Sequence, residues 1–506
     1  KALGRSRQAA LEFNAWTVAT TAGLSNRMSR LGLRHPLKLS LKFSRKLMRI
    51  LFAATVIWLT SSGWLTAADG VGRYAIIVRQ GMPWTQAVAA LQQRYSGQVF
   101  TFRTAAAEVR SAVAQYKPRY VCFVCEPTEN FPEFVLEANR FCRELDSDPY
   151  VDAIWGILTG LDEQHAVQLA RAEPVVVRRA FTKTQADWLD WIAEGEYVTE
   201  WTRDRGEVGT KRPKQQVQML SGGPKSDADD LKHVHGMLSR DDFDLIIGSG
   251  HGGQHNWMLM YPSGSGFLTA KEGALTMTAP GVSLPLQASH PKLYWAVGNC
   301  LTGEVNSPQN SFRNSYALAW MKNGARQYIG AVQPTWYELN WNMADWFLKQ
   351  DGRWTFGESL FLLRQWSQFV LAENIAMGQD RRGTEYTDGI FVLYGDPALD
   401  SRLQQNREPA LDETLQVVPL EQPGRVRITY RVKVNFVGTG NKRTAEKYDG
   451  WRIFSHLLPG SFSDVQMEKS DFAKVVVPGE TLIWDAGTGL KVGDQRAVTF
   501  TATQDK

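Results

Sequence analysis

Short apolar segments alternate with amphipathic ones from residue 71 onward. Apolar runs of strand length lie at 74–78, 99–103, 120–124 and 153–158, and helix-spaced apolar residues follow at 85–95, 105–115, 131–145 and 162–172. Strands that alternate with helices build a parallel sheet. The pattern therefore predicts an α/β fold with a doubly wound, mostly parallel sheet.

The alternation is interrupted once and then ends. The stretch 202–230 is polar and rich in Gly, Lys and Asp, which predicts a surface loop or linker that could also be a processing site. Strands are expected again at 244–247, 293–297 and 327–331, and helices at 315–323, 340–349 and 357–373. Beyond residue 399 the apolar period becomes two, as in Arg425 to Phe436, which is typical of half-buried strands.

These changes divide the chain into five expected parts, since 506 residues exceed one ordinary core. They are a leader or signal peptide over 1–68, an α/β subdomain over 69–201, the polar loop or linker over 202–230, a second α/β subdomain over 231–405, and a small β-sandwich over 406–506.

Positive charge is concentrated in the expected leader. Residues 1–70 carry a net +9, which leaves −4 for the rest of a chain whose total is +5. A mildly acidic body gives no electrostatic reason to bind nucleic acid. Basic residues precede the apolar run Ile50–Leu59, and small residues follow at Ala67 and Ala68, as in a signal peptide. We expect a secreted, periplasmic or cell-surface protein without membrane contact after leader removal; a retained anchor is the alternative.

Four cysteines occur, at positions 122, 125, 142 and 300. Cys122 and Cys125 form a C-x-x-C pair, but an offset of three within a strand sends the two thiols to opposite faces. We expect buried apolar cysteines there rather than a zinc or redox site. No Asp-x-Asp-x-Asp-Gly loop is present, so we expect no metal or other cofactor; calcium stays open without a motif for it.

Two apolar strands end in small residues and then a reactive side chain. Asp244–Ile247 leads to Gly-Ser-Gly-His251-Gly-Gly, and Leu293–Val297 leads to Gly-Asn-Cys300-Leu-Thr-Gly. If these strands are neighbours in the sheet, their carboxyl ends place His251 and Cys300 across one crevice. An imidazole can take the thiol proton and later protonate a leaving amine. The N–H groups of Gly252 and Cys300 are candidates for the oxyanion hole.

Plainer interpretations exist for each of these residues. Considered without the His251 segment, Cys300 is equally well explained as an inert thiol of the core. His255, four residues after His251, is a candidate for the pocket wall. The spacing of the two histidines would suit a metal site on a helix, but the surrounding glycines argue against a helix there. Asp242 or Asp244 could orient His251, although an acid at a strand entry is more often simply exposed.

The His251 segment, the Cys300 segment and a third segment near residue 396 follow one another in an order that resembles clan CD cysteine peptidases, which have a caspase-like fold. A strand ending in His251-Gly comes before one ending in Gly-Asn-Cys300, and Leu393-Tyr-Gly-Asp-Pro-Ala-Leu399 resembles the close of the catalytic domain in gingipain-type members. The resemblance covers roughly residues 71–500. It implies a caspase/gingipain-like fold of two subdomains, an immunoglobulin-like module as the C-terminal β-sandwich, and a polypeptide substrate.

The resemblance also implies where specificity resides. Gingipain-like enzymes build part of the primary pocket from the loop after the strand that follows the nucleophile, here Gly330–Tyr337. Gln333, Trp336 and Tyr337 are therefore candidates for the substrate pocket, with core packing as the alternative for the aromatics. A basic P1 residue would need a buried acid, and the sequence does not choose among Glu304, Glu338, Asp380 and Asp388.

Together these patterns predict an exported cysteine endopeptidase that works through His251, Cys300 and a thioester intermediate. One alternative is a catalytically inactive binding or adhesion protein on the same scaffold. Another is a peptidase that acts mainly on its own 202–230 loop. A serine hydrolase is disfavoured because no Gly-x-Ser-x-Gly elbow follows a strand. The oligomeric state is not predicted.

Overall fold

The computed structural model describes residues 72–505 apart from 262–265, 336–337, 376–380 and 438–450. The expected leader over residues 1–68 therefore lies outside the described part. Within that part, no helix has both the length and the apolar character needed to cross a membrane.

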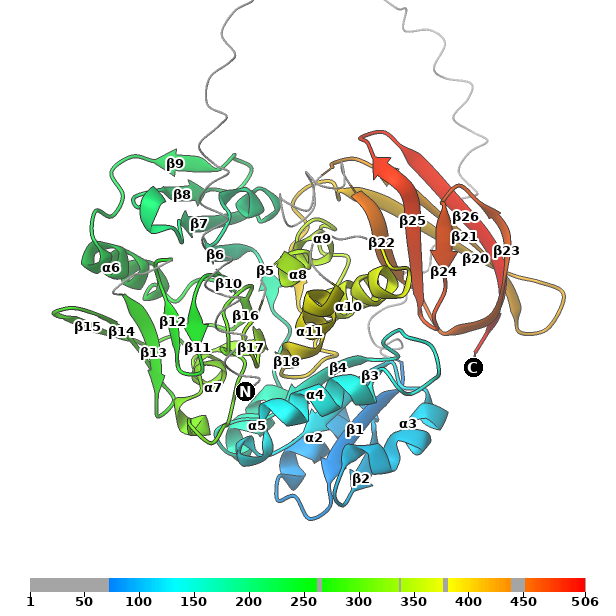
Figure 1. Ribbon diagram of the computed structural model, residues 1–506, viewed down its shortest axis with the longest axis horizontal. Coiled ribbons are helices and arrows are strands. Elements are labelled where there is room, and N and C mark those ends of the chain that lie inside the picture. The colour runs from blue at the N-terminus through cyan, green and yellow to red at the C-terminus, as the bar shows by residue number, and fades with distance from the viewer. Residues whose placement is uncertain (1–71, 262–265, 336–337, 376–380, 438–450, 506) are drawn as a thin grey trace, which may run out of the picture. The chain divides into compact units, whose positions relative to one another are not determined.

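One twelve-stranded sheet organises the α/β part of the chain, and its strands can be followed by their labels in Figure 1. Neighbouring strands pair in parallel except for β17–β18, β7–β8 and β8–β9, which confirms the prediction of a mostly parallel α/β sheet. From edge to edge the strands are β2 (Gln98–Phe102), β1 (Tyr74–Arg79), β3 (Tyr120–Val124), β4 (Ile154–Leu158), β18 (Phe391–Tyr394), β17 (Ala325–Ala331), β16 (Lys292–Ala296), β10 (Leu245–Gly248), β6 (Arg179–Lys183), β7 (Glu194–Val198), β8 (Val208–Lys211) and β9 (Gln218–Leu220).

Helices follow from the same local patterns. α2 coincides with the expected 85–95: Ala87, Ala90 and Leu91 form its buried stripe, and the left-handed Ser96 (φ 52°) ends it. α11 escapes prediction because polar residues such as Thr384 and Asp388 form most of its buried face. The helices are α2 (Thr85–Tyr95), α3 (Arg110–Tyr116), α4 (Pro132–Phe141), α5 (Glu163–Ala170), α6 (Asp227–Leu238), α7 (Tyr316–Lys322), α8 (Glu338–Trp341), α9 (Ala344–Phe347), α10 (Phe356–Ala372) and α11 (Arg381–Ile390).

The twelve-stranded sheet contains strands from both expected subdomains. β6 and β7 fall within the expected 69–201 subdomain, yet β6 pairs with β10 of the expected 231–405 subdomain. The stretch 202–230, expected to be a loop or linker, contains β8, β9 and the start of α6. Pattern analysis misses β9 because all three of its residues are exposed, so no apolar alternation marks it.

A second, antiparallel sheet is inserted between β10 and β16. Its strands are β11 (Gly252–Gly253), β12 (Asn256–Met258), β13 (Phe267–Lys271), β14 (Ala274–Ala279) and β15 (Val282–Leu286). It begins directly after His251, whose carbonyl oxygen accepts a hydrogen bond from the Met258 N–H at 2.9 Å. The insertion therefore anchors the backbone of the His251 turn.

Two antiparallel sheets make up the C-terminal part. One has the order β20 (Leu411–Pro419), β21 (Arg425–Val434), β26 (Gln495–Gln504), β23 (Phe462–Ser470), and the other β22 (Trp451–Leu457), β25 (Thr481–Leu490), β24 (Lys474–Val476). Trp484 on β25 joins the sheets by donating to the Tyr430 hydroxyl on β21 at 3.2 Å. An immunoglobulin-like order would place β24 between β21 and β23. Among the described strands β26 lies there instead, so the strand order departs from the expected one.

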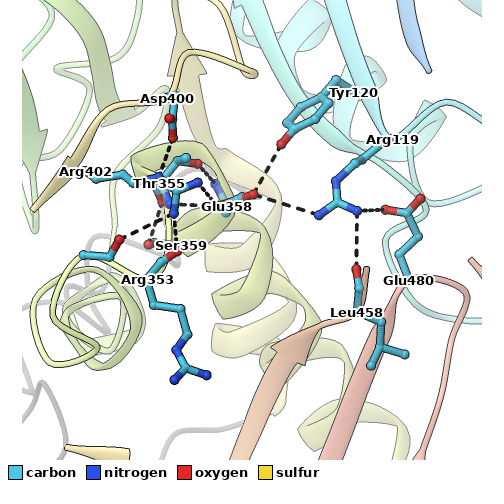
Figure 2. Close-up of polar contacts among 11 residues, drawn as sticks. Arg119, Tyr120, Arg353, Thr355, Glu358, Ser359, Asp400, Arg402, Leu458 and Glu480 are labelled. Atoms are coloured by element: carbon cyan, nitrogen blue, oxygen red, sulfur yellow. Dashed lines mark hydrogen bonds and ion pairs between the residues drawn. The ribbon is translucent and has the colours of Figure 1, made fainter. Parts of the chain in front are cut away.

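A polar junction ties this β-sandwich to the α/β part, and Figure 2 shows it. The Arg119 guanidinium lies 3.1 Å from a Glu480 oxygen and 4.0 Å from a Glu358 oxygen, and it donates to the Leu458 carbonyl at 3.3 Å. Glu358 also closes a capping box with Thr355 at the start of α10. One arginine thus links β3, α10 and the sandwich.

Candidate active site

The two predicted reactive residues follow neighbouring strands. β10 and β16 pair in parallel with Gly248 opposite Ala296, and the Val297 N–H donates to the Gly248 carbonyl at 2.8 Å. His251 comes three residues after β10, and Cys300 comes four residues after β16. Because parallel strands end at the same edge, both turns lie at one carboxyl edge of the sheet, where ligands of such sheets bind.

The two turns are locked together by their small residues. The Asn299 side-chain amide donates to the Gly250 carbonyl at 3.1 Å. A Cβ on Gly252 would lie 2.7 Å from Thr302 Cγ2 and 3.1 Å from the Cys300 carbonyl oxygen, so only glycine permits this approach. Gly250 has a φ of 92°, and Leu301 has a φ of 62°, which a branched side chain rarely adopts. Gly250 adopts this conformation without strain just before His251, whereas the backbone at Leu301, just after Cys300, is strained.

Two buried tyrosines hold the segment that follows Cys300. The Tyr328 hydroxyl donates to the Thr302 carbonyl at 2.9 Å, and the Tyr394 hydroxyl donates to the Gly303 carbonyl at 2.8 Å. Tyr394 belongs to the Leu393–Leu399 segment. Asp396 of the same segment accepts from Tyr74 at 2.9 Å and from Tyr95 at 2.5 Å. The segment therefore positions the turn that contains Cys300 and ties it to β1 and α2.

Cys300 is half-buried, whereas Cys122, Cys125 and Cys142 are buried free thiols, as predicted for the first two. The Thr335 N–H donates to the Cys300 sulfur at 3.4 Å. Burial raises the pKa of the Cys300 thiol, and the backbone N–H of Thr335 opposes that rise. Burial and the neighbouring Cys300 also raise the pKa of Tyr386 on α11. Thr335 and Tyr386 are site residues that sequence patterns missed, although Thr335 lies in the loop expected to form the pocket.

His251 is exposed on one side and covered by an aromatic ring on the other. The centroids of the His251 and Tyr261 rings are 4.6 Å apart, with a tilt of 48°. Partial burial lowers the pKa of the imidazole. Across the described ranges, no hydrogen bond joins His251 to Cys300. The raised pKa of Cys300 and the lowered pKa of His251 both favour the neutral thiol and the neutral imidazole at pH 7. Catalytic hydrogen bonds often tighten only when substrate is bound.

Glu200 is a further site residue that no local pattern singles out. It follows β7, is 4% exposed, and accepts a hydrogen bond from the hydroxyl of Ser249, two residues before His251. Its Oε2 would lie 3.7 Å from a Cβ placed on Gly250. Burial raises the pKa of Glu200 to about 7, although Ser249 and Lys183 oppose the shift. Glu200 thus supports the turn that carries His251.

The remaining candidates divide between the site and other places. Gln333 is half-buried, and its backbone carbonyl accepts a hydrogen bond from the Leu301 N–H at 3.4 Å. Its backbone therefore lies beside the turn that contains Cys300. His255 lies at the exposed tip of the β11–β12 turn, where Asn256 contacts its ring at 3.3 Å. Trp336 and Tyr337, expected in the pocket, lie outside the described residues.

The contacts of Asp242 and Asp244 do not support the possibility that either of them orients His251. Asp244 accepts the backbone N–H groups of Arg178 and Arg179 and lies 2.9 Å from His290 Nε2. Both acids precede β10, whereas His251 follows it, so the acids and His251 lie at opposite ends of this strand. Of the acids considered for a basic pocket, Glu304 is buried beside the Gln254 amide, and Asp388 accepts from Gln368 at 2.6 Å.

One group of carboxylates in the described part of the chain has a spacing that would suit a metal ion. Oxygens of Asp146, Asp148 and Asp152 lie within 4.8 Å of one another. Backbone N–H groups of Leu145 and Tyr150 donate to this group at 2.9 and 2.7 Å. These residues precede β4 and do not belong to the His251–Cys300 site.

No protein-family model and no curated protein sequence matches the chain. Solved structures do match it. The Arg-specific cysteine proteinase gingipain R (RgpB) is 12% identical with a TM-score of 0.42, over 84% of this chain and 97% of that one. The complex of Porphyromonas gingivalis RgpB pro- and mature domains is 11% identical with a TM-score of 0.42, over 82% and 93%.

The chain is similar to gingipains. A further structure, described only as a protease, is 9% identical with a TM-score of 0.42, over 86% of this chain and 97% of that one. Identity to gingipains near one residue in ten assigns no role to any side chain.

Proposed function

We propose that the chain is an exported cysteine endopeptidase in which Cys300 is the nucleophile and His251 the general acid and base. The observation that carries this proposal is the parallel pairing of β10 with β16, which brings the His251 and Cys300 turns to one edge of the sheet. Folding requires neither side chain there. Inert core thiols are fully buried, as Cys142 is, whereas Cys300 is half-buried with a backbone N–H directed at its sulfur.

The neutral resting pair defines the first chemical step. When a peptide binds, His251 takes the thiol proton as the Cys300 sulfur attacks the scissile carbonyl carbon. The carbonyl π electrons move to oxygen and form an oxyanion. His251 then gives its proton to the leaving nitrogen, the C–N bond breaks, and a thioester remains. Water, deprotonated by His251, attacks the thioester carbonyl, and the released Cys300 thiolate recovers the proton.

Backbone groups of the two locked turns supply the oxyanion hole in this proposal. The close approach of Gly252 to Cys300 favours their N–H groups as the donors. Loss of one such donor costs about 10²–10³-fold in turnover. The loop containing Gln333 and Thr335 borders the sulfur, which supports its assignment to the primary pocket together with Trp336 and Tyr337. The basic and apolar leader supports export.

The test uses the mature chain, from residue 69, with a mixed-sequence peptide library under reducing conditions. Wild-type protein is expected to cleave peptides. Cys300→Ala should abolish cleavage, and His251→Ala should slow it by about 10²–10⁴-fold because proton transfer is lost. His255→Ala is the matched control: it removes an exposed histidine four residues away and should leave the rate within about twofold of wild type.

The outcomes separate the proposal from its rivals. Cleavage that survives Cys300→Ala would exclude this nucleophile. A folded wild type that cleaves no peptide would favour the inactive binding or adhesion protein. Cuts confined to the 202–230 stretch of the chain itself would favour a peptidase that acts mainly on itself.

A further inference from the structure

An aromatic wall stands beside His251 on the side covered by Tyr261. The rings of Trp201 and Tyr261 meet edge to face with centroids 4.8 Å apart, and the Arg203 guanidinium lies 4.6 Å from the Trp201 ring centroid. Trp201 and Tyr261 are both half-buried, so neither residue is fully enclosed by the protein. Arg203 is paired with Asp204 at 3.3 Å, which leaves the wall without net charge.

The wall is held in place by backbone contacts. Trp201 and Tyr261 form an isolated parallel bridge. The Thr202 N–H donates to the Tyr261 carbonyl at 2.8 Å, and the Tyr261 N–H donates to the Glu200 carbonyl at 2.6 Å. These bonds join the segment after β7 to the segment after β12. These bonds fix the backbone from which both rings project, which lowers the entropic cost of binding a ligand there.

Strand order places this wall relative to the scissile bond. The neighbouring strands are β17, β16, β10, β6 and β7, in that order. The Thr335 loop follows β17, Cys300 follows β16, His251 follows β10 and Trp201 follows β7, so these residues lie in the same order along the carboxyl ends of the strands. In the proposed reaction His251 protonates the leaving nitrogen, so the leaving group lies on the His251 side of Cys300. A peptide laid across this edge has its residues after the scissile bond over Tyr261 and Trp201.

We propose that Trp201 and Tyr261 form a subsite for an aromatic or large apolar side chain at one of the first two positions after the scissile bond. This inference rests on the proposed function, because the direction of the peptide follows from the role of His251. Offset or edge-to-face contact with two ordered rings favours aromatic side chains, and apolar burial favours large aliphatic ones over glycine. A carboxylate or ammonium group finds no unpaired partner on the wall.

The experiment measures kcat/KM for peptides that share one cleavage site and carry Phe, Leu or Gly at the two positions after it. Wild type should prefer Phe over Gly by about tenfold at one position. Trp201→Ala should reduce that preference to about twofold, and this ratio is measured between two peptides with the same variant. Trp201→Phe should restore the preference. Trp201 is the residue to change, because Tyr261 also contacts His251.

Trp191 supplies a matched control. It is also half-buried and also lies under an arginine, with the Arg407 guanidinium 4.1 Å from its ring centroid, but it packs against Phe436. Trp191→Ala should keep the Phe preference. An enzyme that cleaves without this preference, or keeps it in Trp201→Ala, would overturn the inference and leave the proposed function intact.

A direct binding measurement distinguishes the two failures. Cys300→Ala protein cannot form the thioester, and fluorescence anisotropy would report its affinity for labelled Phe and Gly peptides. About tenfold tighter binding of the Phe peptide, lost when Trp201→Ala is added, supports the subsite even if no peptide is cleaved. Equal affinities would overturn the subsite whatever the fate of the proposed function.

Discussion

At the scale of single residues, the contacts of Cys300 define its chemistry before substrate arrives. Burial raises its pKa above the ordinary value of 9.0, and burial lowers that of His251 below 6.5. Within the described part no hydrogen bond links the two. The thiolate, the reactive form, is therefore scarce at neutral pH in the free protein.

Alkylation of Cys300 by iodoacetamide should accordingly accelerate with pH, with its inflection above pH 9. Because the resting thiol is not paired with the imidazole, His251→Ala should leave this profile nearly unchanged while it impairs peptide cleavage. Mass spectrometry of the Cys300 peptide gives the rates. An inflection between pH 5 and 7 would reveal a thiolate–imidazolium pair and contradict the neutral resting state.

Glu200 gives the second prediction at this scale. Its folded pKa of about 7 exceeds the ordinary glutamate value of 4.5, so the folded protein holds this proton more tightly than the unfolded chain does. The resulting stability is present below pH 4.5 and is lost as pH rises through about 7. Urea unfolding should show the free energy of wild type falling, relative to Glu200→Gln, between pH 5 and 8. Parallel profiles of the two proteins would contradict this account.

At the scale of elements, the junction around Arg119 joins three elements through one side chain. Its partners Glu358 and Glu480 are largely buried, and Tyr120 donates to Glu358 at 3.3 Å. Removal of Arg119 leaves both carboxylates short of positive charge, because Glu480 loses its partner at 3.1 Å and Glu358 keeps, among the described residues, only Arg402 at 3.7 Å. The energetic cost arises from those uncompensated charges more than from the lost hydrogen bonds.

Arg119→Ala should therefore lower the free energy of unfolding by about 3 kcal/mol, measured by urea denaturation at pH 7. Arg427→Ala is the control: Arg427 makes a bidentate pair with Glu468, but both side chains are solvent-exposed, so water compensates their separation. Equal effects of the two substitutions would show that the junction is no stronger than a surface ion pair.

At the scale of the whole molecule, the β-sandwich completes the core of the α/β part. Nearly every residue of α10 is buried. Trp346 donates to the Ser455 carbonyl at 2.8 Å and stacks on Phe454, and the Ser455 hydroxyl donates to the Leu362 carbonyl at 2.7 Å. A helix that is buried on all sides needs cover on all sides. α10 therefore depends on both the sheet and the sandwich.

A chain that ends at residue 408 should fail to give soluble folded protein, because the sandwich-facing surface of α9 and α10 becomes exposed. The full chain should unfold in one urea transition, with near-ultraviolet and far-ultraviolet circular dichroism coinciding. A soluble truncated protein with a native near-ultraviolet spectrum would show instead that the sandwich is an independent appendage.

Local patterns in the sequence indicated most of the elements and the two candidate reactive positions. The apolar period of two or 3.6 identifies β1, α2, β10 and β16, because side-chain direction depends only on near neighbours along the chain. The same patterns place His251 and Cys300 just after strand ends. They miss β9 and α11, whose exposed or polar residues carry no period.

Only the tertiary structure decided which strands are neighbours and what surrounds the site. Pairing of β6 with β10, and of β18 with β4 and β17, depends on contacts between residues distant in sequence, which no local period encodes. The same holds for Glu200, Tyr261 and Thr335, which reach the two reactive residues from separate loops. Strand order brings those loops to one edge of the sheet, and the sequence by itself leaves that order open.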